Sequence, residues 1–362
     1  MVGFMQRLPD STFWQSKRVL LTGHTGFKGA WLAIWLHHLG AKVQGFALAP
    51  ETALSLFDAA GVASLCKHTV GDLRQQEAVQ QVVLDFQPEI VLHLGAQALV
   101  RRSYAQPLNT FATNAMGTAH VLDALRESKS IRSIVVITTD KVYRNDEAGT
   151  PFIESDALGG HDPYSASKAA AEMVIESYRK SFFASAGVGV ISARAGNVIG
   201  GGDTSEDRLI PDAIRAWDQG KVLSIRNPDA VRPWQHVVEP LAAYLCIAQS
   251  LYHDAGLAGA YNLGPADASA VSVGKVIALA KQVYGPAAVD MPALTAQPYE
   301  AHVLRLNVDK AEQVFGIVPV WDVHIALTKT INWYRQVGLG AVDARTACLN
   351  DIQAFCAAQV SP

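Results

Sequence analysis

Short apolar runs alternate with longer amphipathic stretches along the first half of the chain. Runs rich in β-branched residues predict strands, and stretches whose apolar positions recur every three to four residues predict helices. The predicted strands span 18–22, 43–47, 69–71, 90–94, 133–138 and 188–193. The predicted helices between them span 28–39, 75–86, 109–127 and 165–186. Apolar strands that alternate with helices indicate an α/β fold, a Rossmann-type doubly wound parallel sheet covered on both faces.

The alternation breaks near residue 196. A run of three glycines at 200–202 and the pairs Asn227-Pro228 and Arg232-Pro233 mark loops between shorter elements. Helices are predicted at 209–219, 240–251, 273–284 and 323–337, and a connecting loop at 285–297. We therefore expect a Rossmann domain over 1–196 and a smaller mixed α/β substrate-binding lobe over 197–362, with a ligand cleft between them and room for elements to cross back.

Composition narrows the class of partner. The 362 residues are 49% hydrophobic, and 30 Lys and Arg against 33 Asp and Glu give a net charge of −3. This balance predicts no binding to nucleic acid or to a membrane surface. Four scattered cysteines without a CxxC pair predict free buried thiols rather than disulfides or a metal site. Residues 1–17 do not resemble a signal peptide, so we expect a cytoplasmic protein.

A glycine-rich segment joins the first predicted strand to the first predicted helix. It reads Gly23-His24-Thr25-Gly26-Phe27-Lys28-Gly29. Glycine allows the sharp turn and lets the backbone approach a pyrophosphate, while the helix N-terminus offers unpaired N–H groups and a positive dipole end. This placement predicts a dinucleotide site, with His24 and Lys28 as candidate contacts to phosphate or ribose.

The residues that usually select NAD or NADP are missing from the second predicted strand. It ends in residues 45–50, GFALAP, without an acid for the ribose hydroxyls or an Arg for a 2′-phosphate. These residues therefore leave the choice of cofactor open. Asp72 and Leu73 follow the third strand, where Asp72 would either lie near the adenine or cap the next helix.

Tyr164 and Lys168 lie four positions apart in a predicted helix, so their side chains share a face. An ammonium near a phenol favours the phenolate, which would let a tyrosine of reference pKa about 10 act as a base near neutral pH. We expect both side chains to contact the cofactor and the substrate. A chance surface pair is the alternative.

Thr139, Asp140 and Lys141 directly follow the predicted strand 133–138. Catalytic side chains in open α/β sheets gather at the carboxyl ends of strands, so we expect these three in the cleft. Thr139 would join the tyrosine–lysine pair in a catalytic triad. Asp140 and Lys141 add an acid and a candidate base, which an elimination requires and a simple hydride transfer does not. The alternative for Asp140 is that it caps a turn.

Together these residues resemble the sugar-nucleotide dehydratases of the extended short-chain dehydrogenase/reductase family. The resemblance includes the GxxGxxG loop, RAGNVIGGGD at 194–203, DRLIPD at 207–212 and RPWQHV at 232–237, and runs from about residue 13 to residue 334. Lys141 in third place of its triplet is similar to the CDP-glucose branch of that family. The chain departs from the family at Thr204, Tyr299 and Asn307, where Trp, His and Asp are common.

The resemblance implies conversion of CDP-D-glucose to CDP-4-dehydro-6-deoxy-D-glucose and water, with NAD as the cofactor. Tyr164 would take the proton of the sugar 4-hydroxyl while the C4 hydride passes to the nicotinamide, from which it returns at C6. Thr139 would orient the 4-hydroxyl, and Asp140 would protonate the leaving 6-hydroxyl. Lys141 would either remove the C5 proton or stabilise the enolate as a cation.

The second lobe supplies candidate substrate contacts. They are Asn197, Arg208, Arg232, His236 and Glu300. Either arginine could pair bidentately with a diphosphate, an ordinary ion-paired arginine being the alternative. His236, which we place at the start of a strand, is as well explained by a structural role. The helices 109–127 and 165–186 carry apolar stripes, which the family uses for a homodimer or a dimer of dimers and which a monomer could also bury.

Two other functions share most of these features. A sugar-nucleotide 4-epimerase or 4-ketoreductase needs the cofactor loop, Tyr164 and Lys168, but not the Asp140-Lys141 pair. A cofactor-sensing protein without catalysis keeps the fold, although such proteins commonly lose the catalytic tyrosine or lysine.

Overall fold

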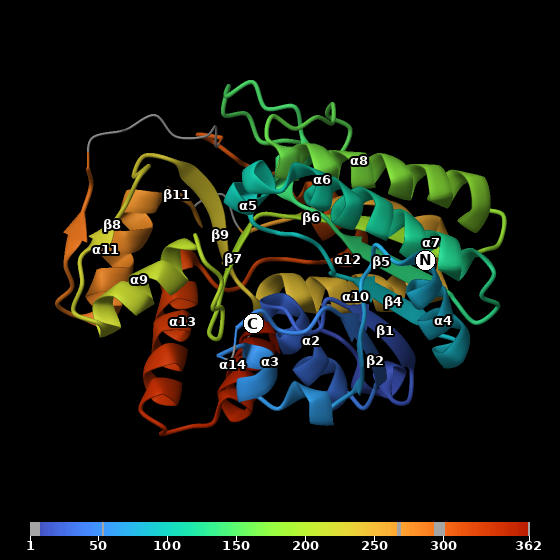
Figure 1. Ribbon diagram of the computed structural model, residues 1–362, viewed down its shortest axis with the longest axis horizontal. Coiled ribbons are helices and arrows are strands. Elements are labelled where there is room, and N and C mark those ends of the chain that lie inside the picture. The colour runs from blue at the N-terminus through green and yellow to red at the C-terminus, as the bar shows by residue number, and fades with distance from the viewer. Residues whose placement is uncertain (1–7, 53, 266–268, 293–300, 361–362) are drawn as a thin grey trace.

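A seven-stranded sheet forms the centre of the molecule in the computed structural model, which describes residues 8–52, 54–265, 269–292 and 301–360 (Figure 1). The strands are β1 (Arg18–Thr22), β2 (Lys42–Ala47), β3 (Lys67–Val70), β4 (Ile90–His93), β5 (Ser133–Ile137), β6 (Gly189–Ala195) and β10 (Gly259–Leu263). They lie in the order β10-β6-β5-β4-β1-β2-β3, and every neighbouring pair is parallel. The order reverses between β1 and β4, and ligands of such sheets bind at that reversal, beyond the carboxyl ends of the strands.

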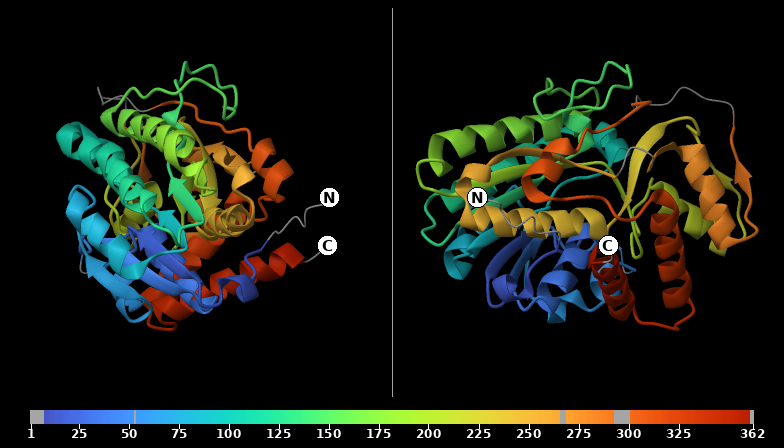
Figure 2. Two further views of the ribbon diagram at one scale, coloured as in Figure 1. Left: turned by 90° about the vertical axis from the view of Figure 1, so that its right-hand side faces the viewer. Right: turned by 180° about the vertical axis from the view of Figure 1, so that it is seen from behind.

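Helices cover both faces of this sheet (Figures 1 and 2). One layer holds α4 (Gln76–Phe86), α7 (Gly117–Arg126) and α8 (Pro163–Tyr178), and the other holds α2 (Phe27–His38) and α10 (Val238–His253), with α14 (Ala344–Val360) packed against α2. Val19 and Leu21 of β1 share a core with Trp31 of α2. Leu20, between them, packs in the opposite core with Val121 of α7. Burial on both faces explains the apolar runs within β1, β4 and β5. The predicted doubly wound sheet is confirmed.

A smaller lobe lies beyond the carboxyl ends of the strands. It holds β7 (Asn197–Ile199), β8 (Leu223–Ser224), β9 (Val231–His236), β11 (Ala270–Ser272) and β12 (Val289–Asp290), with α9 (Leu209–Asp218), α11 (Val273–Tyr284) and α13 (Val323–Gly338). Its mixed sheet has the order β11-β9-β7, and β12 pairs with β8. Between β9 and β11 the chain returns to the central sheet as α10 and β10. The division of the chain at residue 196 stays a prediction.

The predicted elements agree closely with the observed ones, with informative exceptions. The predicted helices 109–127 and 165–186 contain π-helical turns at Ala112–Met116 and Arg179–Phe183, and the first begins earlier, as α6 (Pro107–Phe111). The predicted loop 285–297 includes the short strand β12. Strand β10, α14, α5 (Val100–Ala105) and α12 (Asp309–Phe315) were not predicted. The β10 sequence GAYNL contains no β-branched residue and one aromatic residue, so its local signal for a strand is weak.

Candidate active site

The end of β5 carries a buried carboxyl group with one unused oxygen. Thr139 caps a short 3₁₀ turn (Asp140–Val142), and its hydroxyl donates to Asp140 Oδ1 over 2.9 Å. Lys141 Nζ donates to the same oxygen over 3.1 Å. Asp140 is fully buried, and its Oδ2 meets no hydrogen-bond partner among the described residues. Thr139 rather than Asp140 caps the turn, so the capping alternative for Asp140 is wrong, and a carboxyl oxygen is left available for chemistry.

Tyr164 and Lys168 stand one turn apart at the start of α8. Asp162 caps the helix by accepting from Ser165 N over 3.0 Å, and Pro163 occupies the first helical position. Lys168 Nζ donates to Ile137 O of β5 over 3.1 Å, which fixes α8 against the strand that ends in the Thr139 turn. Both side chains are buried. The structure thus brings together the five predicted catalytic residues.

Burial controls the pKa of both groups. Burial raises the pKa of Tyr164 to about 12, although a hydrogen bond with Thr139 and the nearby Arg208 guanidinium act in the opposite direction. Burial lowers the pKa of Lys168 to about 8, and the Glu172 carboxylate opposes that change. We predicted that the ammonium would favour the phenolate. In the protein alone, however, burial outweighs the Thr139 hydrogen bond and the Arg208 charge, so the Tyr164 hydroxyl keeps its proton at neutral pH.

The glycine loop has the shape that a dinucleotide phosphate needs. Gly23 has φ +77°, and a Cβ there would lie 2.8 Å from Gly95 N. A Cβ at Gly29 would lie 2.0 Å from Gly23 O, so α2 can begin here only without a side chain. Gly26 is different, because its Cβ would meet the protein no closer than 3.4 Å. No side chain in the described structure caps α2. Its N–H groups and the open face of Gly26 therefore fit a pyrophosphate.

Two loop side chains point toward the sheet. The His24 ring is buried over Gly45, and its Nε2 lies 2.7 Å from His68 Nδ1. Burial, with the neighbouring His68, lowers the pKa of His24 to about 4, so this ring is neutral at pH 7 and offers no positive charge to a phosphate. Thr25 Oγ1 donates to Leu48 O over 2.9 Å and ties the loop to the end of β2.

Phe27 points toward the second lobe, and Lys28 Nζ lies 5.8 Å from the ring centre of Tyr244 in α10. The Phe27 ring lies 3.1 Å from the place a Cβ of Gly200 would take. Burial, with Lys168 and Arg208 adding and Asp140 opposing, lowers the pKa of Lys28 to about 7. The charges that act on Lys28 are those of the catalytic cluster, so its amine lies nearer to that cluster than its place in the loop suggested.

Asp72 does not cap a helix, because α4 begins at Gln76 with Gln75 as its cap. Its carboxylate instead accepts from the backbone and guanidinium of Arg74, which lowers the pKa of Asp72. A contact with adenine stays a prediction. Leu73 is buried where Cβ atoms at Gly95 and Gly117 would strike it, at 2.6 and 2.9 Å. Leu73 thus packs against Gly95, which itself lies next to Gly23 of the glycine loop.

Among the predicted substrate contacts, Arg208 lies beside the catalytic cluster. Its positive charge lowers the pKa values of Tyr164 and Lys28, and its Nη2 donates to Ala98 O over 3.2 Å. Asn197 is half-buried at the first position of β7, directly after the Gly196 link from β6. Both positions are compatible with a ligand between the lobes.

The structure gives less support to the other predicted substrate contacts, Arg232, His236 and Glu300. The Arg232 guanidinium donates to the carbonyls of Val231, Ala301 and His302, and so braces the segment that follows Glu300. His236 ends β9 rather than beginning a strand, and its ring is fully buried between Trp31 and Trp321. Burial lowers the pKa of His236 to about 3, so the structure gives it a core role and not the predicted substrate contact. Glu300 and Tyr299 lie outside the described residues.

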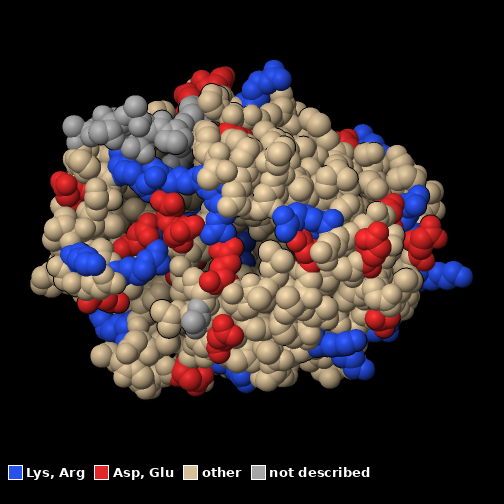
Figure 3. All heavy atoms as spheres, viewed as in Figure 1, with Lys and Arg blue, Asp and Glu red and all other residues tan. Residues whose placement is uncertain are grey.

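A charged rim, which the sequence analysis missed, joins the lobes around this cluster. Arg102 of α5 pairs with Glu51 over 2.5 Å and with Glu206 over 2.8 Å. Asp207 pairs with Arg226 over 3.0 Å and with Arg101 over 3.7 Å. Figure 3 shows acidic and basic side chains gathered around a hollow in the middle of this face. The rim pairs its arginines with carboxylates, so its charges are balanced. In the sequence, the adjacent pair Arg101-Arg102 could have indicated this charged rim.

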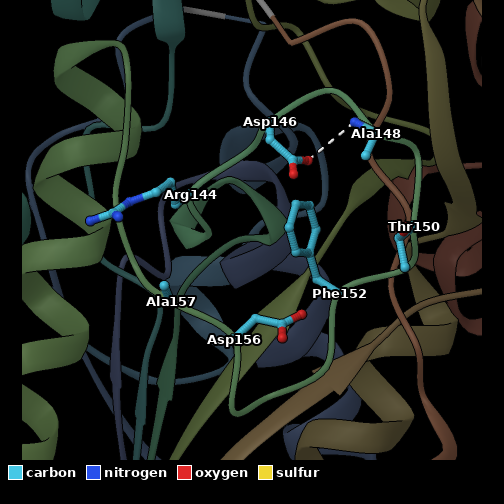
Figure 4. A pocket seen from close by; sticks show the side chains of 7 residues that line it. All are labelled: Arg144, Asp146, Ala148, Thr150, Phe152, Asp156 and Ala157. Atoms are coloured by element: carbon cyan, nitrogen blue, oxygen red, sulfur yellow. Dashed lines mark hydrogen bonds between the residues drawn. The ribbon is translucent and has the colours of Figure 1, made fainter.

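A second hollow lies apart from the catalytic cluster, on the loop 144–157 (Figure 4). It has a volume of about 260 Å³ and is lined in part by Asp146, Asp156 and Phe152. The Phe152 ring stacks on Tyr143 with centroids 4.8 Å apart. Arg144 points away from Phe152 in this view. The hollow adjoins the ring of Tyr143, two residues after Lys141, but holds none of the predicted site residues.

The described part of the chain offers neither a metal site nor a membrane-spanning helix. It contains no group of three or more His, Cys, Asp or Glu side chains that could hold a metal ion. None of its helices is both long and apolar enough to cross a membrane. The four cysteines are free thiols.

A doubly wound parallel sheet, a GxxGxxG loop at its first helix and a buried Tyr-xxx-Lys pair beside the end of β5 define an extended short-chain dehydrogenase/reductase. Within that class, residues 20–330 match the family model for GDP-mannose 4,6 dehydratase, and the chain belongs to that family. The resemblance drawn from the sequence is thereby confirmed.

Named relatives support the assignment. The chain is 43% identical to a CDP-glucose 4,6-dehydratase of Salmonella typhimurium, over 90% of this chain and 92% of that one. It is 27% identical to a dTDP-glucose 4,6-dehydratase of Escherichia coli, over 73% and 78% of the two chains. The crystal structure of dTDP-glucose 4,6-dehydratase from Bacillus anthracis in complex with NAD superposes with a TM-score of 0.75, covering 89% of this chain and 97% of that chain. At 21% identity it shows the shared fold.

Proposed function

We propose that this protein is a 4,6-dehydratase that converts CDP-D-glucose to CDP-4-dehydro-6-deoxy-D-glucose and water with NAD as its cofactor. The observation that carries the proposal is the Asp140 carboxyl, buried beside Tyr164 with one oxygen unpaired in the described structure. Epimerases and simple ketoreductases need the tyrosine and lysine but no such acid. The 43% identity to a CDP-glucose 4,6-dehydratase supports the choice of CDP-glucose.

The glycine loop and the start of α2 would hold the cofactor diphosphate, with Asp72 and Leu73 toward the adenosine end and Tyr164 and Lys168 toward the nicotinamide. When bound, NAD supplies a hydride acceptor and a positively charged ring. A positive charge near Tyr164 opposes the effect of burial on the pKa of the phenol. The residues present fit this cofactor, since Gly26 leaves the approach open and no capping side chain within the described chain competes at the helix end.

Oxidation at C4 requires the sugar 4-hydroxyl to lose a proton. Tyr164 would accept that proton as a phenolate, with Lys168 stabilising the negative charge from one turn along α8. Thr139 hydrogen-bonds with Tyr164, so its hydroxyl can also orient the 4-hydroxyl. The oxidised sugar carries a 4-ketone, which acidifies the C5–H bond.

Elimination then removes the C5 proton and the C6 hydroxyl. Asp140 Oδ2 would donate a proton to the leaving hydroxyl, which departs as water. Lys141 Nζ, 3.1 Å from Asp140 Oδ1, would serve the same step either as the C5 base or as a cation beside the enolate. Hydride returned at C6 and a proton at C5 complete the 4-keto-6-deoxy sugar, so the net change is the loss of one water.

A panel of CDP-, dTDP-, UDP- and GDP-glucose with product mass recorded tests this function. We expect a loss of 18 mass units, one water, with CDP-glucose in preference to the others. Lys141→Met and Lys141→Arg separate the two roles of Lys141, since only a cationic role survives in the arginine variant. A 4-epimer of unchanged mass, or NAD binding without turnover of any sugar nucleotide, would refute the dehydratase proposal.

We also propose that the protein is a homodimer, or a dimer of such dimers, in the cytoplasm, where NAD and nucleotide sugars are available. The surface of α6, its π-helical turn and α8 exposes several large apolar side chains. They include Leu108 at 85%, Met173 at 59% and Met116 at 54% exposure. Leu108→Glu with Met173→Glu should give a monomer in sedimentation analysis, whereas Leu339→Glu, at 78% exposure on the other lobe, should not. A wild-type monomer would contradict the proposal.

A further inference from the structure

A third ionisable side chain continues the catalytic row on α8. Tyr164, Lys168 and Glu172 follow at intervals of four residues, so they share one face of the helix. All three are buried, with exposures of 8%, 6% and 3%. The established chemistry of a tyrosine–lysine pair makes no use of a carboxylate at this place. A carboxylate is rarely buried so completely unless something holds it.

Glu172 is held from the two strands beneath the site. Thr138 Oγ1 donates to Glu172 Oε1 over 2.5 Å, and Ser192 Oγ donates to Oε2 over 2.8 Å. Arg194 Nη2 also donates to Oε2 over 2.8 Å. Thr138 immediately precedes Thr139, so one carboxylate connects the catalytic helix to the catalytic end of β5 and to β6.

The partners of Glu172 are themselves fixed. Arg194 Nη1 donates to Tyr143 Oη over 2.9 Å and to Glu154 O over 3.1 Å. Tyr143 donates in turn to Asn262 Oδ1 of β10 over 2.5 Å. Because every member is anchored to a different element, the Glu172 carboxylate is fixed in place one helical turn after Lys168.

We propose that Glu172 is a positioning residue that acts through Lys168, holding α8 against β5 and keeping the Lys168 side chain in its ammonium form. This inference rests on the proposed function, because it assigns Glu172 to the proton transfer at C4. Glu172 touches neither the phenol nor the space beside Asp140, so it is not a catalytic residue in its own right.

The charges around Lys168 show why a carboxylate is needed. Burial lowers the pKa of Lys168 to about 8, and Glu172 on the same helix opposes this change. From α2, Lys28 lies close enough for the Lys168 charge to lower the pKa of its amine. From β4, His93 is neutral, because burial and Lys168 lower its pKa to about 3. Arg194 of β6 faces Glu172 and offsets part of its charge. Asp140 faces Lys28, whose pKa it raises.

The direction of the effect follows from these charges. Lys168 is an ammonium below its pKa, and it is useful to the phenolate only in that form. Removing the negative charge of Glu172 lowers the pKa of Lys168 further, so the alkaline limit of activity moves to lower pH. An opposite charge at close range shifts a pKa by about one unit or more. A purely structural glutamate would change the melting temperature or the rate at all pH values alike.

The test compares kcat/KM for CDP-glucose from pH 6 to pH 9.5 in the NAD-saturated full chain. Glu172→Gln keeps the shape of the side chain and removes its charge. The alkaline limb of the profile is the range in which kcat/KM falls as the pH rises. In Glu172→Gln we expect this limb to shift to lower pH by about one unit, with activity near the wild-type level at pH 6. Two matched controls should leave the limb in place. Ser192→Ala removes one neutral hydrogen bond from the same carboxylate, and Glu176→Gln removes an exposed charge one turn further along α8, where it pairs with Lys180.

Glu172→Gln leaves Arg194 buried without its carboxylate, which can cost stability. The double variant E172Q/R194Q removes both charges together, and we expect its limb to move in the same direction by a smaller amount. A limb that stays at the wild-type pH in whichever variant folds would overturn the inference, even if the melting temperature falls. A failure of the proposed function would look different from a failure of the inference about Glu172. In that case the wild-type protein would form no dehydrated product from CDP-glucose at any pH.

Discussion

Gly196 faces the Asp140 carboxylate so closely that a Cβ at position 196 would stand 3.2 Å from Oδ2. The same Cβ would lie 2.5 Å from the Pro233 ring, so a side chain here could not move back. The glycine after β6 therefore leaves room for the backbone to pass beside the buried, unpaired oxygen of Asp140. This relationship links the chain reversal from β6 to β7 with the acid that the elimination needs.

Asp140→Asn should stop dehydration while leaving the fold intact. The amide keeps an oxygen for Thr139 and Lys141 but cannot protonate the leaving hydroxyl, so we expect kcat to fall by about 10²–10⁴-fold. The measurement is the rate at which a product lighter by one water forms. NAD binding, followed by fluorescence quenching, should be unchanged. Dehydration at the wild-type rate would remove Asp140 from the mechanism.

Tyr164→Phe should abolish oxidation at C4. The aromatic ring still fills the buried site, but no group remains to accept the 4-hydroxyl proton, and we expect at least about a 10²-fold loss in kcat. Binding of CDP-glucose, measured by calorimetry, should persist. Tyr284→Phe, at the end of α11, loses only a hydrogen bond to Asp218 of α9; it is the control and should keep full activity. Equal losses in both variants would mean that the phenol of Tyr164 has no special part.

Two glycines of the loop should respond differently to alanine. In Gly29→Ala the Cβ would stand 2.0 Å from Gly23 O, so the loop must distort and the melting temperature should fall. In Gly26→Ala the Cβ meets nothing closer than 3.4 Å, so the fold should survive. NAD affinity should nevertheless drop at least about tenfold, because the methyl group occupies the phosphate approach. Unchanged affinity in Gly26→Ala would place the cofactor elsewhere.

Glu239 should make stability depend on pH in an unusual direction. Burial raises its pKa to about 7, although the backbone N–H groups of Trp321 and Val320 donate to it. An acid with a raised pKa contributes fully below its unfolded value near 4.5, and this contribution is lost as pH rises through about 7. Glu239→Gln should therefore match the wild type near pH 4.5 and be more stable by up to about 3 kcal/mol at pH 8.

Thermal unfolding at these two pH values checks the Glu239 prediction. Glu312→Gln, on the exposed side of α12, serves as the comparison and should show no such change between the two pH values. A Glu239→Gln protein that gains nothing at pH 8 would mean that the wild-type carboxylate is adequately solvated there.

The grouping of the candidate catalytic residues was predictable because their signals are local. A turn after a strand, a glycine spacing and a four-residue interval in a helix are all written in short stretches of sequence, and the structure brings their residues together. The four-residue spacing of Tyr164, Lys168 and Glu172 can be read from the sequence equally well. The role proposed for Glu172, however, depends on hydrogen bonds from Thr138, Ser192 and Arg194, which lie far from it in the sequence.

The direction in which a side chain points and the extent of its burial were harder to predict than the element on which it lies. His24 and Lys28 are four residues apart in one loop, yet one ring turns toward β3 and one amine toward the catalytic cluster. His236 is a polar residue that aromatic packing buries completely. Burial raises the pKa of the Tyr164 phenol by more than the Thr139 hydrogen bond and the Arg208 guanidinium lower it. Each outcome depends on long-range packing, which periodicity and spacing do not encode.

Strand β10 has a consequence for how the chain is made. All seven residues of β6 are buried, yet its outer edge is completed only by residues 259–263. While a ribosome is still adding residues 196–258, the nascent sheet exposes an apolar strand with free hydrogen-bonding groups, the kind of edge on which chains associate wrongly. The cofactor-binding half must therefore wait for much of the other half to be synthesised before its last strand can close the sheet.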